Sequence, residues 1–283
     1  EFIYAKTEIF VDATLSSCAS NSNKNIFSKV NMALKYAKEE GLKFWIYEDS
    51  MQTGDEYENN IKFAIKIRKA LNSGGLIPYF QPIIDNDTGK VVKYEALSRL
   101  VDEKGVVHPP NMFIPAAKKI KAYDKVTKEV IDKTFEIFKN NLLEFSINLS
   151  FDDIINPEIY KFIISKLQTS QIGTRVTFEL LESEKVKDFK KVIRFFKEIK
   201  RHGVKVAIDD FGSGFSNFSY MTKLSPDFIK IDGSLIKDLD TDKNAQIVVE
   251  TIVDFAKKLG IKTVAEYVHS STILSTVKNM GID

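Results

Sequence analysis

From residue 75 onward, short runs of β-branched and aromatic residues alternate with stretches whose apolar positions recur at helical spacing. The spacing predicts helices at Pro157–Leu167, Asp188–His202 and Lys243–Leu259. Seven runs are predicted as strands: Ile77–Ile84, Val91–Leu100, Glu144–Leu149, Arg175–Leu180, Val204–Asp209, Asp227–Asp232 and Ile261–Glu266. Strands that alternate with helices are typical of parallel α/β folds. We therefore expect a TIM-like (β/α) barrel, in which Gly203 and Gly260 end helices.

The predicted barrel lacks its last strand in this chain, because such a barrel closes with eight strands and the sequence reaches only seven before Asp283. The first fifty residues form a separate small β-α-β piece. It has a strand at Glu8–Leu15, a helix at Ile26–Glu40 and a strand at Phe44–Tyr47. A linking helix is expected at Glu56–Leu71. We thus divide the chain into residues 1–50, a linker at 51–74 and the barrel at 75–283.

Composition narrows the class of protein. The 283 residues are 43% hydrophobic and 28% charged, which is typical of a globular chain. The net charge of +2 gives no electrostatic basis for binding long nucleic acid. A single cysteine, Cys18, excludes an internal disulfide and a zinc site built on cysteine pairs. No apolar run approaches the length of a membrane span, and the start lacks a signal peptide. We expect a cytoplasmic location, either alone or as the cytoplasmic part of a larger membrane-anchored protein.

Polar and ionised residues interrupt the apolar pattern of the strands. Successive side chains of a strand point to opposite faces, so Glu95 and Arg99 share one face. The equivalent inward positions on the other strands are Gln81, Asn148, Glu179, Asp209, Lys230, Asp232 and Glu266. Burying a charge is costly unless it is paired or bound to a metal. We therefore expect these side chains to meet at the mouth of the barrel, where such barrels build active sites.

The residue types in this set favour magnesium or manganese, because they offer oxygen ligands without cysteine or histidine. Asp209 and Asp210 are adjacent, and carboxylates this close repel each other unless they bridge cations. The pattern predicts hydrolysis of a phosphodiester with two divalent cations. Arg99 is suited to hold a phosphate, and Lys230 to orient the attacking water or neutralise charge in the transition state. Any one carboxylate taken alone fits a structural ion pair equally well.

A series of motifs in fixed order runs from Leu76 to Glu266. The motifs are Tyr79–Ile83, Tyr94–Leu100, Phe113–Ala117, Ile147–Ser150, Phe178–Glu182, Ile208–Ser216, Ile229–Asp232 and Val264–Glu266. Together they resemble the EAL domain, the bacterial phosphodiesterases that open cyclic di-GMP to linear pGpG. The resemblance implies a TIM-like barrel of the EAL type, two Mg²⁺ or Mn²⁺ ions and cyclic di-GMP as the substrate. It also makes a homodimer plausible.

The resemblance assigns roles residue by residue. Glu95, Asn148, Glu179 and Asp209 match ligands of the first metal, while Asp210 and Asp232 match positions at or beside the second. Lys230 matches the catalytic lysine, and Glu266 matches a general base or second-metal ligand. Gln81 and Arg99 match substrate contacts, and Glu182 matches a residue that steadies the loop at 211–217. The chain departs from the family pattern at Lys118, Leu181, Tyr267 and His269, which are outside these sets.

The opening piece resembles the C-terminal part of a degenerate GGDEF domain, through the helix at Asn31–Gly41. This resemblance implies an upstream GGDEF domain, with or without sensory domains, in the full-length protein. No cyclase activity is expected from these residues, since the signature of that domain lies outside them.

Two alternatives to the enzyme stay open at this point. The first is an inactive receptor that binds cyclic di-GMP and relays binding to a partner. The second is an interaction scaffold that neither binds nor hydrolyses it. The three histidines, His108, His202 and His269, lack the spacing of metal ligands and are expected on the surface or in loops. The lysines at 118–121 and 185–191 are expected on solvated helix faces.

Overall fold

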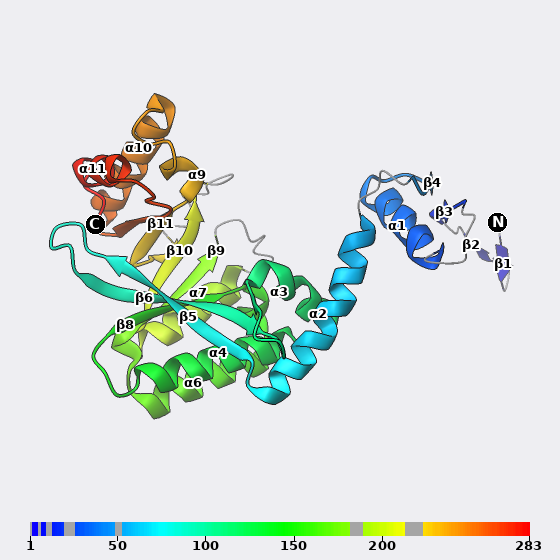
Figure 1. Cartoon of the computed structure of the whole chain (residues 1–283), viewed down its shortest axis with the longest axis horizontal. Coiled ribbons are helices and arrows are strands. Elements are labelled where there is room, and N and C mark those ends of the chain that lie inside the picture. Colours follow the sequence, from blue (N-terminus) through cyan, green and yellow to red (C-terminus); the bar gives the residue numbers. More distant parts are fainter. Residues whose placement is uncertain are drawn as a thin grey trace. The chain divides into compact units, whose positions relative to one another are not determined.

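A computed structural model describes residues 2–4, 7–9, 13–19, 26–48, 53–181, 189–212 and 223–283 (Figure 1). It contains two compact units, Glu1–Lys66 and Ile67–Asp283. The helix α2 (Thr53–Ser73) runs across the division between them. The described helices include none that is long and apolar enough to cross a membrane.

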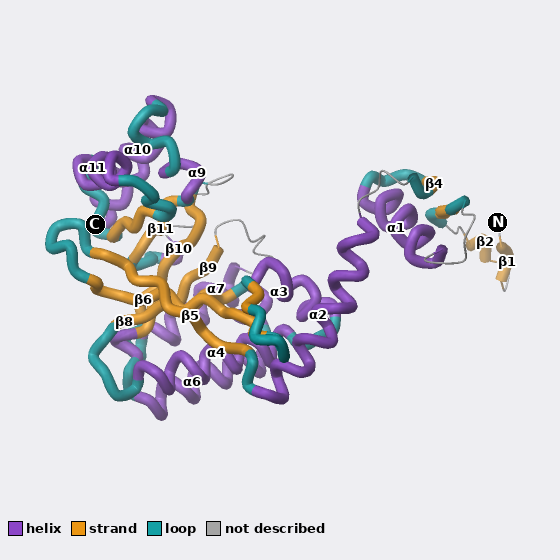
Figure 2. Tube along the Cα trace, viewed as in Figure 1, coloured by secondary structure: helices purple, strands orange, loops and turns teal. Residues whose placement is uncertain are grey.

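The second unit is built on one curled sheet with helices around it (Figure 2). Its strands are β5 (Leu76–Ile84), β6 (Val91–Val101), β7 (Val107–His108), β8 (Glu144–Leu149), β9 (Val176–Leu181), β10 (Lys205–Phe211), β11 (Phe228–Ile231) and β12 (Lys262–Ala265). The hydrogen-bonded order is β12-β11-β10-β9-β8-β6-β5, with β7 beside β6. Pairing is parallel from β6 through β8 to β12, whereas β5 and β7 run antiparallel to β6.

All seven predicted strands are therefore present, each within two residues of its predicted ends. Among the described residues β12 and β5 form the two ends of the strand path and do not pair with each other. The sheet is an incomplete TIM-like barrel, as the pattern predicted. The helices of this unit are α3 (Pro110–Lys119), α4 (Tyr123–Phe138), α5 (Phe151–Ile155), α6 (Pro157–Ser170), α7 (Phe189–Lys200), α9 (Gly233–Ile236), α10 (Lys243–Leu259) and α11 (Ser271–Asn279), with a 3-10 turn at Gly173–Arg175.

The hydrophobic core lies between the outer face of the sheet and the helices. Phe145 of β8 is fully buried and stacks on Phe138 of α4, with ring centroids 4.6 Å apart. Phe178 of β9 packs against Phe195 of α7 with tilted rings, whose centroids are 6.4 Å apart. These apolar positions alternate with the polar ones along each strand, as period two requires. Burial of the outer face thus fixes the register that turns the polar positions inward.

Glycines end two of the predicted helices. Gly260 follows α10 in the left-handed conformation, with φ +69°, and its amide donates to Ala256 and Lys257 carbonyls. Gly203 has φ +81°, and a Cβ there would lie 2.7 Å from the Cγ2 atom of Thr174. A side chain at Gly203 would therefore be both strained and crowded.

The first unit contains a β-α-β piece in which β3 (Leu15–Ser17) and β4 (Phe44–Ile46) pair in parallel on either side of α1 (Ile26–Glu39) in the sequence. A separate antiparallel pair joins β1 (Phe2–Tyr4) and β2 (Thr7–Ile9). The single strand predicted at Glu8–Leu15 is therefore wrong, since β2 and β3 belong to different sheets. The apolar alternation runs through both strands in one phase, so it could not reveal the change of partner.

The division between the compact units falls inside α2, whereas the sequence placed the linker at 51–74 and the barrel from 75. Those domain boundaries stay predictions. Ala33 and Ala37 of α1 are fully buried, which shows that this helix has its own small packed face.

Candidate active site

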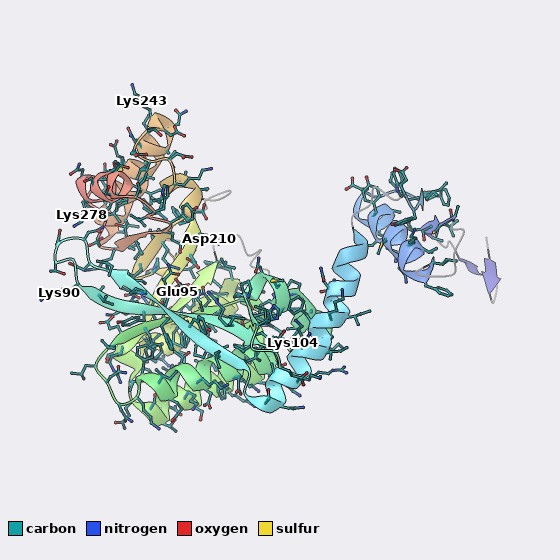
Figure 3. All side chains as sticks on the ribbon, viewed as in Figure 1. Lys90, Glu95, Lys104, Asp210, Lys243 and Lys278 are labelled. Atoms are coloured by element: carbon teal, nitrogen blue, oxygen red, sulfur yellow. The ribbon has the colours of Figure 1, made fainter. Side chains whose placement is uncertain are left out.

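The centre of the candidate site is the ammonium group of Lys230, which projects from β11 with 3% of its side chain exposed. Its Nζ atom lies 3.0 Å from Glu95 Oε2 and 2.8 Å from Glu179 Oε2. It also lies 2.7 Å from Asp209 Oδ1 and 2.8 Å from Glu266 Oε1. Figure 3 labels Glu95 of this cluster, on β6. Side chains from four strands and from the residue after β12 thus converge, as the inward-facing pattern predicted.

The four carboxylates exceed what one lysine can satisfy. An ammonium group has three protons, so it can donate to at most three of them. The buried Oδ1 atom of Asp209 is the one without a hydrogen bond, although its distance to Nζ is short. Burial on its own lowers the pKa of Lys230, but the attraction of Glu179, Glu95, Asp209 and Glu266 outweighs burial and raises that pKa well above its usual value. The lysine is therefore charged, and the cluster still carries an excess of negative charge.

The carboxylates form two overlapping groups that fit two divalent cations. Oxygen atoms of Glu95, Glu179 and Asp209 all lie within 4.8 Å of one another, as do those of Asp209, Asp210 and Glu266. Asp209 belongs to both groups, which is the arrangement expected of a residue that bridges two ions. Oxygen ligands without cysteine or histidine suit Mg²⁺ or Mn²⁺. The unsatisfied Asp209 oxygen and the excess charge are the features that a cation would neutralise.

A β-bulge brings Asp209 and Asp210 to the same site. In a regular strand adjacent side chains point to opposite faces. The pairing of β10 with β11 shifts register between Ile208 and Phe211, and Asp210 has φ +55°. The bulge and the left-handed backbone allow both carboxylates to reach one group. A non-glycine residue in this conformation costs free energy, so its presence at the site supports a functional role.

Three of the carboxyl groups have raised pKa values. Burial, followed by repulsion from Glu95 and Asp209, raises the pKa of Glu179 to about 7 against the pull of Lys230. Burial and then repulsion from Asp209 and Glu95 raise the pKa of Glu266 to about 7, again opposed by Lys230. The pKa of Asp210 is raised by burial and by repulsion from Asp209 and Asp232. The site therefore holds protons near neutral pH that a cation would displace.

Other predicted site residues surround this cluster at different distances. The Nδ2 atom of Asn148 donates to Glu95 Oε1 at 2.8 Å, so Asn148 joins the first group. Gln81 of β5 is the register partner of Glu95 and is exposed. Arg99 lies four residues beyond Glu95 on β6, where it donates to the Ser98 carbonyl at 2.9 Å and lies 5.6 Å from the Tyr79 ring centroid. The structure thus brings Asn148 into contact with the carboxylates and leaves Arg99 beside Tyr79.

Among the described residues, Asp232 does not belong to either carboxylate group. Asp232 is the N-cap of α9, and its Oδ1 atom accepts from the Ser234 amide at 2.8 Å. It lies close enough to Asp210 to raise the pKa of that residue. Glu182 falls outside the described residues, as do residues 213–217 of the loop that it was predicted to steady. The roles of both residues stay predictions.

A buried carboxylate that the sequence analysis did not single out holds the turn after Asn148. Asp153 is 2% exposed and its Oδ2 atom accepts from the Ser150 amide at 2.9 Å and from the Ser150 hydroxyl at 2.7 Å. The hydroxyls of Tyr123 and Thr127 each donate to it at 2.8 Å. The Ser-x-x-Asp spacing of a capping box was the signal that could have identified it.

Replacing Asp153 with Ala is expected to lower the free energy of unfolding by about 3 kcal/mol, because the half-buried Tyr123 hydroxyl, the buried Thr127 hydroxyl and the Ser150 amide would lose their acceptor. Urea unfolding followed by circular dichroism measures this change. Asp152→Ala is the matched control, since Asp152 is exposed and forms a surface ion pair with Lys118 at 3.3 Å. Equal losses in both variants would show that Asp153 has no special structural role.

The histidines do not contribute to the acidic groups found among the described residues. His108 is not on the surface as expected but is 8% exposed, with its Nε2 atom 3.0 Å from Asp102 Oδ2. The short strand β7 pairs with β6 and places His108 opposite Leu100, which the sequence pattern did not reveal. His269 is exposed, in agreement with the prediction.

One protein family and several known proteins are similar to this chain. The family model described as EAL domain matches residues 65–283. The chain is 28% identical over 270 residues to the cyclic di-GMP phosphodiesterase PdeB of Shewanella oneidensis, covering 92% of this chain and 31% of that protein. It is 30% identical over 244 residues to the cyclic di-GMP phosphodiesterase PdeA of Borreliella burgdorferi, covering 84% of this chain and 36% of that protein. The chain thus spans about a third of the length of these relatives.

Among solved structures, the FimX EAL domain of Pseudomonas aeruginosa bound to c-di-GMP superposes with a TM-score of 0.72. That match has 22% sequence identity and covers 78% of this chain and 91% of the other. At this identity the likeness shows the fold, and it agrees with the incomplete barrel described above.

Proposed function

The chain belongs to the EAL domain family, and from this membership we propose that it hydrolyses cyclic di-GMP to linear pGpG with two divalent cations, Mg²⁺ or Mn²⁺. The observation that carries the proposal is the pair of carboxylate groups that share Asp209 and surround Lys230. The relatives named as cyclic di-GMP phosphodiesterases support the choice of substrate.

The proposed ligands of the first cation are Glu95, Asn148, Glu179 and Asp209, and those of the second are Asp209, Asp210 and Glu266, with Asp232 beside them. When bound, two such cations supply Lewis acidity and activate a water for attack on phosphorus. Gln81 and Arg99 are proposed to contact the substrate, Arg99 through a phosphate. Glu182 is proposed to steady the loop at 211–217.

Lys230 and Glu266 are proposed to have different roles in the reaction, charge neutralisation for Lys230 and proton transfer or cation binding for Glu266. Because its pKa is raised, Lys230 stays protonated and cannot act as a base; it is suited to neutralise negative charge that develops on the phosphate. Glu266 is proposed either as a ligand of the second cation or as the general base; in the second role its partly exposed carboxylate would accept a proton from the attacking water. The water oxygen bonds to phosphorus, the bond to the ribose oxygen breaks, and that oxygen takes up a proton.

The test is to incubate the chain with cyclic di-GMP and either Mg²⁺ or Mn²⁺ and to follow pGpG by chromatography. Product that forms with either ion and disappears with a chelator supports the proposal. Tight binding of cyclic di-GMP without turnover would instead support a receptor that relays binding to a partner. The structure of the FimX EAL domain with c-di-GMP bound supports this second candidate, because an EAL fold there holds the intact dinucleotide. Neither binding nor turnover would indicate an interaction scaffold.

The affinity for the cations is expected to fall on acidification. The pKa values of Glu179 and Glu266 rise from an ordinary 4.5 to about 7 in the metal-free fold, so below pH 7 each cation must displace a proton. Each site should bind about tenfold more weakly at pH 6 than at pH 8. Calorimetric titration with Mg²⁺ in two buffers of different ionisation enthalpy measures the affinity and the protons released.

The same shifts predict the stability of the metal-free protein. A carboxyl whose pKa is raised by folding stabilises the fold while it is protonated, and this contribution is lost as the pH rises through 7. With chelator present, the midpoint of thermal unfolding should therefore be higher at pH 6 than at pH 8, and Glu179→Gln should reduce the difference. Equal Mg²⁺ affinity at both pH values would contradict the assignment of these two ligands.

The proposal also covers the N-terminal piece, the oligomeric state and the cellular location. Residues 1–50 are proposed as the C-terminal fragment of a degenerate GGDEF-like domain, with further GGDEF and sensory segments upstream in the full-length protein. A homodimer and a cytoplasmic location are also proposed. The parallel β3-α1-β4 piece is compatible with such a fragment.

A further inference from the structure

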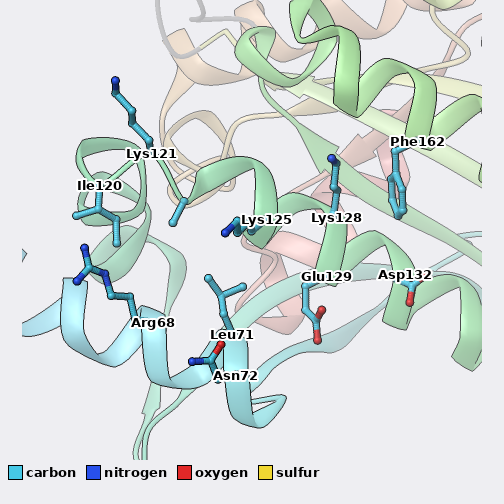
Figure 4. Close-up of a pocket in the computed structure, with 11 residues that line it drawn as sticks. Arg68, Leu71, Asn72, Ile120, Lys121, Lys125, Lys128, Glu129, Asp132 and Phe162 are labelled. Atoms are coloured by element: carbon cyan, nitrogen blue, oxygen red, sulfur yellow. The ribbon is translucent and has the colours of Figure 1, made fainter.

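A second site lies on the outside of the barrel unit, in a cavity of about 770 Å³ (Figure 4). The C-terminal end of α2, the turn from α3 to α4, and α4 itself form most of its wall. Phe162 of α6 completes it. None of the carboxylates around Lys230 lines this cavity. Its volume is within the range of ordinary small-molecule sites.

The cavity is lined by four cationic side chains and two acidic ones. The cationic residues are Arg68, Lys121, Lys125 and Lys128, and the acidic ones are Glu129 and Asp132. Both acids already have partners that lie outside the lining. Glu129 Oε1 lies 3.0 Å from Lys133 Nζ, and Asp132 forms an ion pair with Lys166 of α6. The charge of the two acids is thus neutralised from elsewhere.

Lys133, the partner of Glu129, also connects α4 to the segment between α2 and β5. Its Nζ atom also donates to the carbonyls of Gly74, at 2.8 Å, and Leu76, at 2.6 Å. These hydrogen bonds join α4 to the connection between α2 and β5, and the ion pair with Glu129 helps to orient Lys133 for them. Asp132 likewise stabilises the contact between α4 and α6 through its ion pair with Lys166.

The four cations, by contrast, form no ion pair with any residue in the described parts of the second unit. Lys121 is exposed, as predicted, but it lies in the turn before α4 with φ +55° and not on a helix face, and it lines the cavity. Four positive charges around one concave surface repel one another, and a multiply charged anion would relieve that repulsion. The charge arrangement therefore favours an anionic ligand.

The start of α4 adds to this preference. Its N-cap residue, Ala122, lines the cavity and has no side chain that can accept from the first-turn amides. A helix N-terminus carries partial positive charge, which favours anions. Asp124 lies in the same turn but does not line the cavity.

The end of the cavity opposite Arg68 and Lys121 is lined by an aromatic and an acidic side chain. In Figure 4 Arg68 and Lys121 lie at one end, Lys125 lies between, and Phe162 and Asp132 lie at the other end. An aromatic ring can stack on a base, and a carboxylate oxygen can accept from a base N–H group. A ligand that carries phosphates at one end and a flat heterocycle at the other would match both ends.

We propose that this cavity binds a nucleoside 5′-diphosphate or triphosphate, with its phosphates on Arg68, Lys121 and Lys125 and its base against Phe162. The ligand would connect the C-terminal end of α2 to α4. This inference is independent of the proposed hydrolysis, because the two sites share no residue.

The test uses the whole chain with chelator present, which removes divalent cations and leaves the carboxylate cluster negatively charged and unfavourable to anions. Adenosine 5′-diphosphate and inorganic pyrophosphate are the two probes, each titrated by calorimetry. Lys125→Glu is expected to weaken binding of the nucleotide by at least about tenfold. Phe162→Leu should weaken binding of the nucleotide and leave pyrophosphate binding unchanged.

Lys243→Glu is the matched control. Lys243 (Figure 3) is an exposed lysine in the first turn of α10, just as Lys125 is an exposed lysine in the first turn of α4. Both substitutions change the net charge equally, and Lys243→Glu should alter the affinity by less than about twofold. If Lys125→Glu unfolds, Arg68→Gln provides the same comparison.

Three results would overturn the proposal. The first is the absence of nucleotide binding up to about 1 mM. The second is an equal loss of affinity in Lys125→Glu and Lys243→Glu, which would show general surface attraction. The third is pyrophosphate binding as tight as that of the nucleotide, which would remove the role of Phe162.

Discussion

Glu95→Gln is expected to reduce cyclic di-GMP hydrolysis at least about 100-fold without lowering the stability of the metal-free protein. Gln keeps the shape of the side chain and an oxygen that can accept from Asn148, which now donates to Oε1 at 2.8 Å. It removes one negative charge from a cluster in which four carboxylates surround one lysine. Because the cluster has more negative charge than Lys230 can neutralise, the fold tolerates this loss, but a cation would not.

Initial rates of pGpG formation at saturating Mg²⁺ measure the first part of this prediction, and urea unfolding in chelator measures the second. Glu103→Gln is the matched control, since Glu103 is exposed and pairs with Lys69 at 2.7 Å on the surface of the same unit. Its rate should stay within about twofold of the unsubstituted chain. Unchanged hydrolysis in Glu95→Gln would refute the metal role of Glu95. A large loss of stability would show that the Glu95 carboxylate is needed to balance the charge of Lys230, and that the cluster has no excess of negative charge.

Much of the site followed from the alternation of residues along the strands. Phe178 and Leu180 pack outward while Glu179 points to Lys230, so burial of one face determines what the other face presents. The same reasoning predicts from the sequence that Glu95, Asp209 and Lys230 lie together. Period two and the rule that strand ends of a barrel meet at one mouth were sufficient for these residues.

Other features depended on information that alternation does not contain. A bulge between Ile208 and Phe211 brings Asp210 beside Asp209, and a strict period of two would have separated them. The hydroxyls that hold Asp153 come from α4, far away in the sequence, so only the tertiary fold could show that network. The same is true of the cavity, in which neutralisation of Glu129 by Lys133 leaves Lys125 unbalanced.

Lys93 and Lys230 are both buried in the barrel interior, and their surroundings shift their pKa values in opposite directions. Lys93 lies on β6 two residues before Glu95, on the same inward face, with its Nζ atom 2.9 Å from Thr177 Oγ1 and 3.5 Å from the Phe228 ring centroid. Burial lowers the pKa of Lys93 to about 8 because the nearby carboxylates only partly offset it. At Lys230 four contacting carboxylates reverse the direction of the shift. Only the second lysine is therefore held as a permanent cation.

Lys230→Met is accordingly expected to lower cyclic di-GMP hydrolysis at least about 1,000-fold even at saturating Mg²⁺, because no other cationic side chain contacts the cluster in the described residues. In chelator at pH 8 it should also cost about 3 kcal/mol of unfolding free energy, since four carboxylates would lose their counter-charge. The cost should be smaller at pH 6, where Glu179 and Glu266 are protonated. Mg²⁺ should restore the stability without restoring turnover.

Lys93→Met separates this effect from the general cost of removing a buried lysine. Lys93 is 6% exposed and faces the same interior, but its Nζ atom donates to Thr177 and forms no ion pair with the cluster in the described residues, so its replacement should change the hydrolysis rate by less than about twofold. Rates and urea unfolding curves for both variants, each with Mg²⁺ and with chelator, make the comparison complete. Turnover within tenfold of the unsubstituted chain in Lys230→Met would exclude a catalytic role for this lysine. Stability that Mg²⁺ fails to restore would mean that the cations do not replace its charge.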